Sequence, residues 1–242
     1  MRLALRGGFA VAAVVGAAAA AWALLPGRVH VARATVIAAP QATVFELLND
    51  PSTMRRWSPW RAPGARFLFS GPRVGPGARV DWTGRDPGGE AIARSHPYDA
   101  VDYRMEFRGL PAAEQFRLTP ARGGVRVEWR LQRSAGWDPV RRAQLFLFRS
   151  QAGVDLEHGL DRLGEVAEAL PRADLATARV RLVQRPEGWA VEAVSPGDLL
   201  DPALAAARLY MGLHRLAPAG PARVEARGDA LTIVTPVRAA GA

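Results

Sequence analysis

The sequence contains neither lysine nor cysteine, and each absence excludes a group of functions. All 32 side chains counted as Lys or Arg are arginines. Without lysine there can be no Schiff-base residue, no pyridoxal-phosphate anchor, no phosphate-loop lysine and no Ser-x-x-Lys acyl enzyme. Without cysteine there can be no disulfide, thiolate metal site, cysteine nucleophile or lipid-anchored cysteine.

The composition nevertheless predicts a folded chain. Of the 242 residues, 49% are hydrophobic and 23% are charged, which is typical of a globular protein with a buried core. The formal net charge is +9, but the arginines are scattered singly rather than clustered. We therefore expect a solvated surface and no nucleic-acid partner. Attraction to anionic lipid headgroups is the functional alternative.

The N-terminus indicates a membrane. Residues 7–25 form an uncharged run of 19 residues, with Arg2 and Arg6 before it and Arg28 after it. Such a run is long enough to cross a bilayer, and the early arginines favour a cytoplasmic start. We expect a single-pass anchor with the folded part outside the cytoplasm, in the periplasm. Two alternatives remain: Ala17–Ala21 resembles a signal-peptidase site and would lead to secretion, and the run could be a buried helix.

Downstream residues alternate with period two, which is typical of antiparallel strands with one buried face. A first strand is expected around residues 29–37, followed by a short helix after Pro40 and a shorter helical turn within 51–60. Six further strands are predicted at residues 66–70, 78–83, 90–96, 101–107, 113–119 and 124–133. After Pro139, apolar residues recur every three or four positions up to Leu170, which predicts one long amphipathic helix.

Several short stretches resemble a known superfamily. They are Val36–Pro40 with Val44 and Phe45, Trp57-Ser58-Pro59-Trp60, Phe69–Pro72, Gly75–Ala78 and Trp82. Together they resemble the START-like (SRPBCC) superfamily, in its membrane-anchored bacterial branch described as polyketide cyclase/dehydrase-like. The resemblance covers roughly residues 29–170. It implies an α+β helix-grip fold, in which a curved antiparallel sheet wraps around a long C-terminal helix and encloses a hydrophobic cavity. It carries over no catalytic set.

Strand alternation also predicts which side chains face the inside of the sheet. These are Val80, Trp82, Tyr103, Met105, Phe107, Phe116, Leu118, Val127, Trp129 and Leu131. The candidate ligand-binding residues are Trp82, Tyr103, Met105, Phe107, Phe116 and Trp129, together with Trp57 and Trp60 at the cavity mouth, as gate or plug. The alternative is that these side chains simply pack against the long helix.

Few residues suggest catalysis. Glu114 shares the inward parity and is the one candidate general acid or base, although at the start of its strand it is expected to reach water. Asp81, Asp102 and Glu128 have the outward parity and should be solvated or paired with arginines. The four histidines have no metal-ligand spacing, so no metal and no cofactor are expected.

After a linker near residues 173–176 a second pattern begins. Strands are predicted at residues 177–184 and 189–194, a helix at 201–214, and a hairpin at 222–227 and 230–235. This ββαββ pattern resembles one half of a GyrI-like effector-binding module. The predicted division is therefore an N-terminal anchor or signal peptide (1–28), a START-like domain (29–172) and a small C-terminal unit (173–242).

Three hypotheses for function follow. The first is a membrane-tethered, extracytoplasmic binding protein for a hydrophobic small molecule or lipid. The second is a cyclase or dehydrase that uses a cavity carboxylate. The third is a protein-interaction module, which would need only a filled core.

Overall fold

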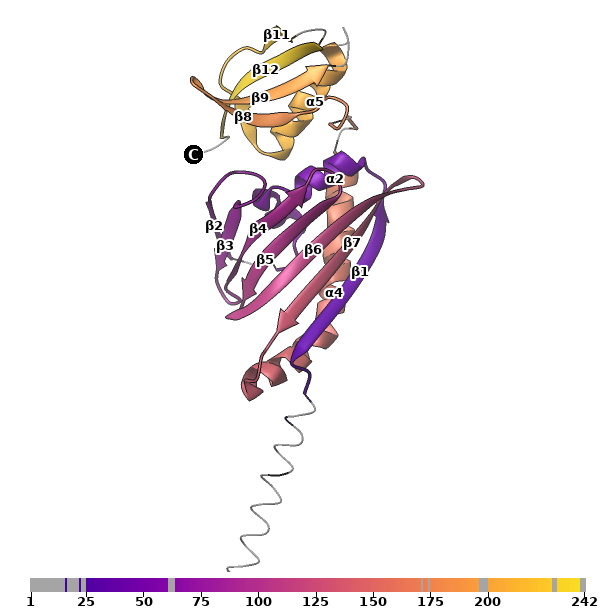
Figure 1. Cartoon of the computed structure of the whole chain (residues 1–242), viewed down its shortest axis with the longest axis vertical. Coiled ribbons are helices and arrows are strands. Elements are labelled where there is room, and N and C mark those ends of the chain that lie inside the picture. Colours follow the sequence, from indigo (N-terminus) through magenta and orange to yellow (C-terminus); the bar gives the residue numbers. More distant parts are fainter. Residues whose placement is uncertain are drawn as a thin grey trace, which may run out of the picture.

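The computed structural model describes residues 16, 22, 25–60, 64–170, 172–173, 175–195, 200–227 and 230–239. Apart from Gly16, Trp22 and Leu25, the predicted anchor at residues 7–25 lies outside these residues. None of the helices within the described ranges is long and apolar enough to cross a membrane. The described chain forms two β-sheets, each with its own helices (Figure 1).

The first sheet is antiparallel and has seven strands in the order β1-β7-β6-β5-β4-β3-β2. The strands are β1 (Arg28–Ile37), β2 (Arg66–Ser70), β3 (Arg79–Thr83), β4 (Gly88–His96), β5 (Ala100–Phe107), β6 (Leu110–Ala121) and β7 (Gly124–Ser134). Every strand that alternation predicts is present, with ends shifted by up to three residues. The first strand, β1, pairs with the last, β7, so that the N-terminal strand forms one edge of the sheet.

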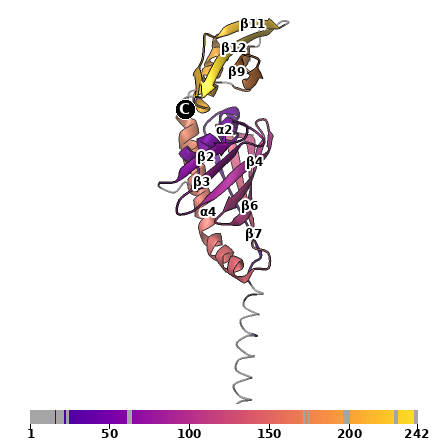
Figure 2. The ribbon, with the colours of Figure 1, turned by 90° about the vertical axis from the view of Figure 1, so that its left-hand side faces the viewer.

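One face of this sheet is covered by helices (Figure 2). They are α2 (Gln41–Leu48), a 3-10 turn (Pro51–Thr53), α3 (Met54–Trp57) and the long α4 (Pro139–Glu168). The α4 helix begins after Asp138, whose side chain accepts hydrogen bonds from the amides of Val140 and Arg141. Its buried leucines, which include Leu156, Leu160 and Leu163, lie against the sheet. This α+β arrangement of a curved antiparallel sheet and a long helix is consistent with a helix-grip fold.

A glycine allows α4 to approach the sheet closely. A Cβ atom at Gly159 would overlap Cζ3 of Trp129 and lie 2.9 Å from Cδ of Pro59. Real Cβ atoms do not approach carbon this closely, so only glycine fits without movement of its neighbours. The helix, the indole of β7 and the segment after α3 therefore meet at one point.

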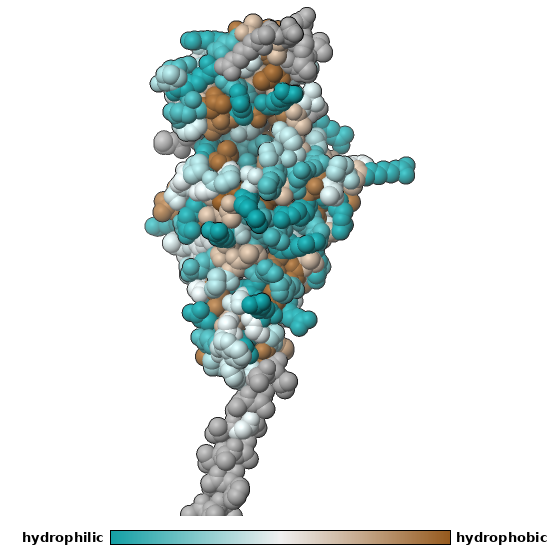
Figure 3. Space-filling model, in the orientation of Figure 1, coloured by the Kyte–Doolittle hydropathy of each residue, from teal (hydrophilic) through white to brown (hydrophobic). Residues whose placement is uncertain are grey.

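The outer face of the sheet is mostly hydrophilic (Figure 3). As alternation predicts, its carboxylates pair with arginines: Asp81 with Arg79, Asp102 with Arg94 and Arg117, and Glu128 with Arg130. Most of these ion pairs are exposed on the arginine side, so they contribute little to stability.

The second sheet is smaller. It contains β8 (Arg181–Arg185), β9 (Gly188–Ser195), β10 (Leu216–Pro218), β11 (Arg223–Arg227) and β12 (Ala230–Ala239), with α5 (Leu200–Leu213) packed on it. The strand predicted at residues 177–184 was placed too early, because Thr177–Arg179 form turns and Arg179 has a positive φ of 43°. The short strand β10 was not predicted.

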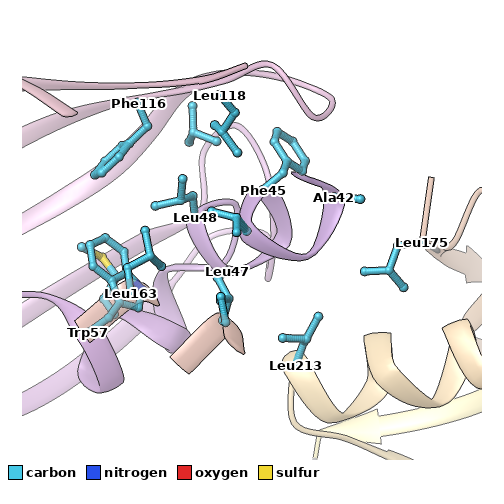
Figure 4. Packing of buried hydrophobic residues seen from close by; sticks show 14 of the residues in the cluster. Ala42, Phe45, Leu47, Leu48, Trp57, Phe116, Leu118, Leu163, Leu175 and Leu213 are labelled. Carbon is cyan, nitrogen blue, oxygen red and sulfur yellow. The ribbon is translucent and has the colours of Figure 1, made fainter. Parts of the chain in front are cut away.

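The two units are joined by one continuous hydrophobic core. Leu175 and Leu213 of the second unit point towards Ala42 and Leu47 of α2 (Figure 4). A buried polar cluster lies at the same junction. His214 Nδ1 is 2.6 Å from Oδ2 of Asp50, and His214 Nε2 is 3.2 Å from Oε2 of Glu46.

The imidazole of His214 is fully buried in this cluster. Burial alone lowers its pKa. The hydrogen bonds to Asp50 and Glu46 raise the pKa by more than burial lowers it, so that the net pKa is about 9. With both ring nitrogens bonded to carboxylates, the imidazole is a protonated donor at neutral pH. The C-terminal unit thus contributes a buried cation to two acidic side chains of the first unit.

Candidate functional site

The inward-facing side chains of the first sheet form the candidate site. Trp82, Tyr103, Met105, Phe116 and Trp129 are all buried, and Phe107 is half-buried, as alternation predicts. Trp57 of α3 and Trp60, which follows it, are buried against them. Aromatic rings meet at short range: the ring centroids of Phe116 and Trp129 are 4.9 Å apart, and those of Trp57 and Trp129 are 5.8 Å apart.

These side chains occupy most of the space between the sheet and α4. The cavity that remains measures about 10 Å³, room for about one water molecule at most, and is lined by Trp60, Trp82, Glu90 and a few neighbours. Tyr103 is also fixed, because its hydroxyl donates a hydrogen bond to the backbone oxygen of Leu48. The role of these eight residues in ligand binding stays a prediction, and in this structure they pack on one another.

One glutamate, Glu90, lines this small cavity, and a second, Glu114, is bonded to Trp60, which also lines it. Glu114 is fully buried in the middle of β6, so the expectation that it reaches water at a frayed strand end is wrong. The strand begins at Leu110, three residues before the alternating pattern that predicted a strand at residues 113–119. Glu90 of β4, which sequence reasoning did not single out, is also fully buried and lies beside Val80 of β3 and Met105 of β5.

The carboxyl groups of Glu90 and Glu114 lack a charged partner within the described ranges. Trp60 Nε1 donates a hydrogen bond of 3.0 Å to Oε1 of Glu114. Both carboxyl oxygens of Glu90 and Oε2 of Glu114 are buried without a hydrogen-bond partner in the described part of the chain. Two uncompensated carboxyls in an apolar interior favour the protonated form.

The pKa values follow from this environment. Burial raises the pKa of Glu114 to about 7, against the opposing effect of the indole N–H groups of Trp60 and Trp129. The N–H of Trp129 affects the pKa of Glu114 by its proximity only, because its Nε1 makes no hydrogen bond to any residue of the described chain. Burial and the charge of Glu114 raise the pKa of Glu90 well above its ordinary value. At neutral pH one of these carboxyls can therefore donate a proton and the other group can accept one.

A larger groove opens next to this interior, between α4 and the ends of the central strands. It encloses about 750 Å³, and Trp60, Phe107, Leu110, Leu147 and Phe148 line its apolar part. The indole of Trp60 also lines the small cavity beside Glu90. Trp60 therefore lies between the groove and the two glutamates, whereas Trp57 lines neither space, and their role as gate or plug stays a prediction.

An arginine is built into the wall of the groove. Arg133 of β7 is 5% exposed, donates a hydrogen bond to the backbone oxygen of Phe107, and places its guanidinium 4.4 Å from the ring centroid of Phe148. Burial and the charge of Arg108 lower its pKa to about 10. The groove thus combines an apolar floor with a fixed cation, an arrangement that suits an apolar ligand with one polar end.

The sequence of this part of the chain decides its family. The signature of a family described as "Polyketide cyclase / dehydrase and lipid transport" matches residues 28–168, more than half of the chain. The chain belongs to this family. Membership in the polyketide cyclase/dehydrase and lipid transport family suggests a hydrophobic ligand-binding or cyclase-like function. No curated protein sequence matches the chain significantly.

Solved structures resemble the first unit at low identity. A protein of Chromobacterium violaceum is 15% identical, with a TM-score of 0.44, over 59% of this chain and 99% of its own. A protein of Rhodobacter sphaeroides is 18% identical, with a TM-score of 0.44, over 60% of this chain and 94% of its own. The di-domain ARO/CYC StfQ from the steffimycin biosynthetic pathway is 16% identical, with a TM-score of 0.45, over 58% and 51%.

Sequence reasoning missed three functional candidates. Glu90 could have been found, because it has the parity of Ile92 and faces Val80 across the β3–β4 pair. Arg133 could have been found as well, because it continues the inward parity of Trp129 and Leu131 at the end of β7. His214 meets acidic residues more than 160 positions earlier in the chain, and no local pattern signals such a contact.

Proposed function

We propose that this protein is a membrane-tethered, extracytoplasmic binding protein for a hydrophobic small molecule or lipid, which enters the helix-grip unit through the groove. The observation that carries this proposal is the groove of about 750 Å³ with its apolar floor. Its size lies within the range of pockets for small organic ligands. Family membership supports the same class of ligand.

Trp60 controls how deep the ligand can go. Its ring centroid lies 5.4 Å from that of Phe107 and 6.3 Å from that of Phe148, both in the groove. On the other side, its indole N–H is bonded to Glu114. A ligand that displaces the indole exchanges one hydrogen bond for apolar contacts and joins the groove to the space beside Glu90.

The tether is supported by apolar side chains at one end of the first unit. Trp137, Val140, Phe146 and Leu147 lie at or near the start of α4 and are more than half exposed. The guanidinium of Arg142 lies 5.0 Å from the ring of Trp22 and 4.9 Å from that of Trp137. Tryptophan and arginine side chains next to an apolar segment are typical of a membrane interface.

The tether is tested by fractionation. The full-length protein should stay with membranes through a high-salt wash and leave them only in detergent, whereas a chain that begins near Arg28 should be soluble. A mature N-terminus between Ala18 and Leu25 would contradict the anchor and establish cleavage of a signal peptide.

Binding in the groove is tested with a neutral apolar dye such as Nile red, added to the soluble chain that begins near Arg28. We expect saturable one-to-one binding that Leu147→Ser weakens several-fold. Val140→Ser is the matched control, because Val140 is similarly exposed on the same helix and does not line the groove. No saturable binding by the wild type, or equal losses in both variants, would contradict the proposal.

A second function, that of a cyclase or dehydrase, is favoured by Glu90 and Glu114. A carboxyl with a pKa of about 7 next to a second protonated carboxyl is suited to general acid–base catalysis. Mass spectrometry of the ligand extracted from the purified protein distinguishes the two functions. An enzyme should convert its ligand, and Glu114→Gln should bind it unchanged, whereas a binding protein should release the same compound from both.

A further inference from the structure

A second concave site lies at the junction of the two units, apart from the groove. It encloses about 510 Å³ and is lined on one side by residues that include Ser52, Arg55 and Arg73 of the first unit. The other side is formed by Trp189, Arg215 and further residues of the C-terminal unit. We call this site the interdomain cleft. It differs from the groove in its position and in its charge.

Positive charge dominates the interdomain cleft. Its lining contains five arginines, Arg55, Arg73, Arg79, Arg215 and Arg238, and one carboxylate, Asp50. The carboxylate of Asp50 is already bonded to His214, and Arg79 is paired with Asp81. Arg73, Arg215 and Arg238 have no carboxylate within ion-pair distance in the described part of the chain. The cleft thus gathers cations whose charge its own walls leave uncompensated.

Two arginines that line the cleft, one from each unit, repel each other. Burial and the charge of Arg215 both lower the pKa of Arg55. The guanidinium of Arg55 also lies over the ring of Phe69, at 5.3 Å from its centroid, which fixes its position. Arg55 belongs to the first unit and Arg215 to the second, so docking of the units brings the two cations together. An anion between them would remove this repulsion.

Polar atoms without partners also face the cleft. The Oγ atom of Ser52 and the Nε atom of Arg73 are buried and have no hydrogen-bond partner in the described chain. Each can bond an oxygen of a ligand, and buried polar groups are normally bonded. Next to them the cleft is apolar: Phe69 is 39% exposed and Trp189 is 50% exposed. A ligand that satisfies all of these groups has a charged head and an apolar body.

We propose that the interdomain cleft binds an organic phosphate, with its phosphate between the arginines of both units and its apolar body against Phe69 and Trp189. Phosphate offers several oxygens to arginine forks and to the hydroxyl of Ser52. Because both units contribute, the ligand bridges them and strengthens their docking. The source of the phosphate is a free small molecule or the headgroup of a lipid.

The test uses 1-naphthyl phosphate as the probe, titrated by calorimetry into the full-length chain in a phosphate-free buffer. We expect one saturable site, binding of inorganic phosphate at least tenfold weaker, and no saturable binding of 1-naphthol to this site. Trp189→Ala should weaken the binding of naphthyl phosphate and leave that of inorganic phosphate unchanged. This separates the apolar part of the cleft from its charged part.

Arginine variants locate the site. Arg215→Gln and Arg73→Gln should each weaken naphthyl phosphate binding at least tenfold, and having two variants guards against misfolding of either one. Arg104→Gln is the matched control, because it removes the same charge from an exposed position of β5 outside the cleft. Unchanged affinity in both cleft variants, an equal loss in Arg104→Gln, or equal binding of 1-naphthol would overturn the proposal.

Vesicles distinguish the two sources. The full-length chain is compared on phosphatidylcholine vesicles with and without phosphatidic acid, with naphthyl phosphate as competitor. Phosphatidic acid that displaces the probe from the wild type, and fails to bind Arg215→Gln, identifies a lipid headgroup as the ligand. Probe binding that phosphatidic acid leaves unchanged identifies a free organic phosphate.

Discussion

Among the buried acidic side chains of the described residues are two pairs whose surroundings differ. Asp50 and Glu46 lie at the junction of the units, where His214 is bonded to both. Glu90 and Glu114 lie under the sheet, where the indole of Trp60 bonds one of them and no cation of the described chain reaches either. A buried carboxylate with a cation is held ionised, whereas one without a cation is held protonated.

The difference separates a structural role from a chemical one. Although burial opposes it, hydrogen bonds from His214 and Ser52 lower the pKa of Asp50, so this group stays charged near neutral pH. Burial raises the pKa of Glu114 to about 7, so this group changes its charge in the physiological range. The first pair joins the two units, and the second pair is the one for which we propose proton transfer.

The largest effect is expected from removal of the cation. His214→Ala leaves Asp50 and Glu46 buried without their partner, which should lower the free energy of unfolding by about 3–5 kcal/mol. His96→Ala, at an exposed position of β4, is the control and should have little effect. Urea unfolding of both variants measures the difference. A loss below about 1 kcal/mol would show that the cluster does not hold the units together.

The pH dependence of stability tests the same cation. The pKa of His214 is raised from its ordinary 6.5 to about 9 in the folded protein. Its contribution to stability is therefore fully present below pH 6.5 and is lost as the pH rises through 9, by on the order of 3 kcal/mol. We expect unfolding curves measured between pH 6 and 10 to show this decline in the wild type. If His214→Gln shows the same slope, the assignment is wrong.

Removal of the acid Glu114 from the other pair should stabilise the protein at alkaline pH, whereas removal of His214 should destabilise it. The raised pKa of Glu114 means that its stabilising contribution is present below 4.5 and is lost as the pH rises through about 7. Glu114→Gln cannot ionise, so at pH 8 it should be more stable than the wild type by on the order of 2 kcal/mol. Near pH 4.5 the two proteins should have equal stability.

The control for this prediction is Glu128→Gln on the outer face. A hydrogen bond from Arg130 lowers the pKa of Glu128, so the corresponding substitution should not stabilise the protein at pH 8. Thermal melts of the three proteins at both pH values make the comparison. A Glu114→Gln variant that is less stable than the wild type at pH 8 would place a cation near Glu114 that the described residues do not contain.

The smallest effect on stability is expected from glycine substitutions in α4, which test how tightly the helix packs on Trp129 beside Glu90 and Glu114. Gly159→Ala adds a methyl group that meets Trp129 and Pro59, so it should destabilise the protein by on the order of 1 kcal/mol. Gly164→Ala lies one turn further along α4 with only an ordinary contact at 3.8 Å, and it should stabilise the helix slightly. Equal stability of the two variants would indicate that the wall beside Trp129 can yield to a ligand.

Much of the first unit could be predicted from its sequence because one face of each strand is wet. Alternation located all seven strands and identified Trp82, Tyr103 and Trp129 as inward-facing. It also gave Glu114 its inward parity, but the regular pattern of residues 113–119 stops short of Pro111 and Pro120 and so put Glu114 next to an expected strand end. Both prolines lie inside the ends of β6, so the strand is longer on both sides than its regular pattern and Glu114 becomes an interior position.

The candidate site could be predicted only in part. The aromatic side chains were found from parity, but parity does not give volume, and packing of Trp57, Phe116 and Trp129 on one another leaves a cavity of about 10 Å³. The groove and the interdomain cleft depend on contacts between distant elements. His214, Arg55 and Arg215 acquire their roles only when the two units dock, and no local sequence pattern encodes that event.

The pairing of β1 with β7 has a consequence for folding. The first strand of the unit has a single neighbour in the sheet, and the paired residues are 88 (Ile37 and Val125) to 106 (Arg28 and Ser134) positions apart in sequence. Closing so long a loop is entropically costly, and folds dominated by such distant contacts form slowly. During synthesis β1 must wait, unpaired, until β7 has been made. The strand that follows the proposed tether therefore cannot join the sheet before β7 has been made.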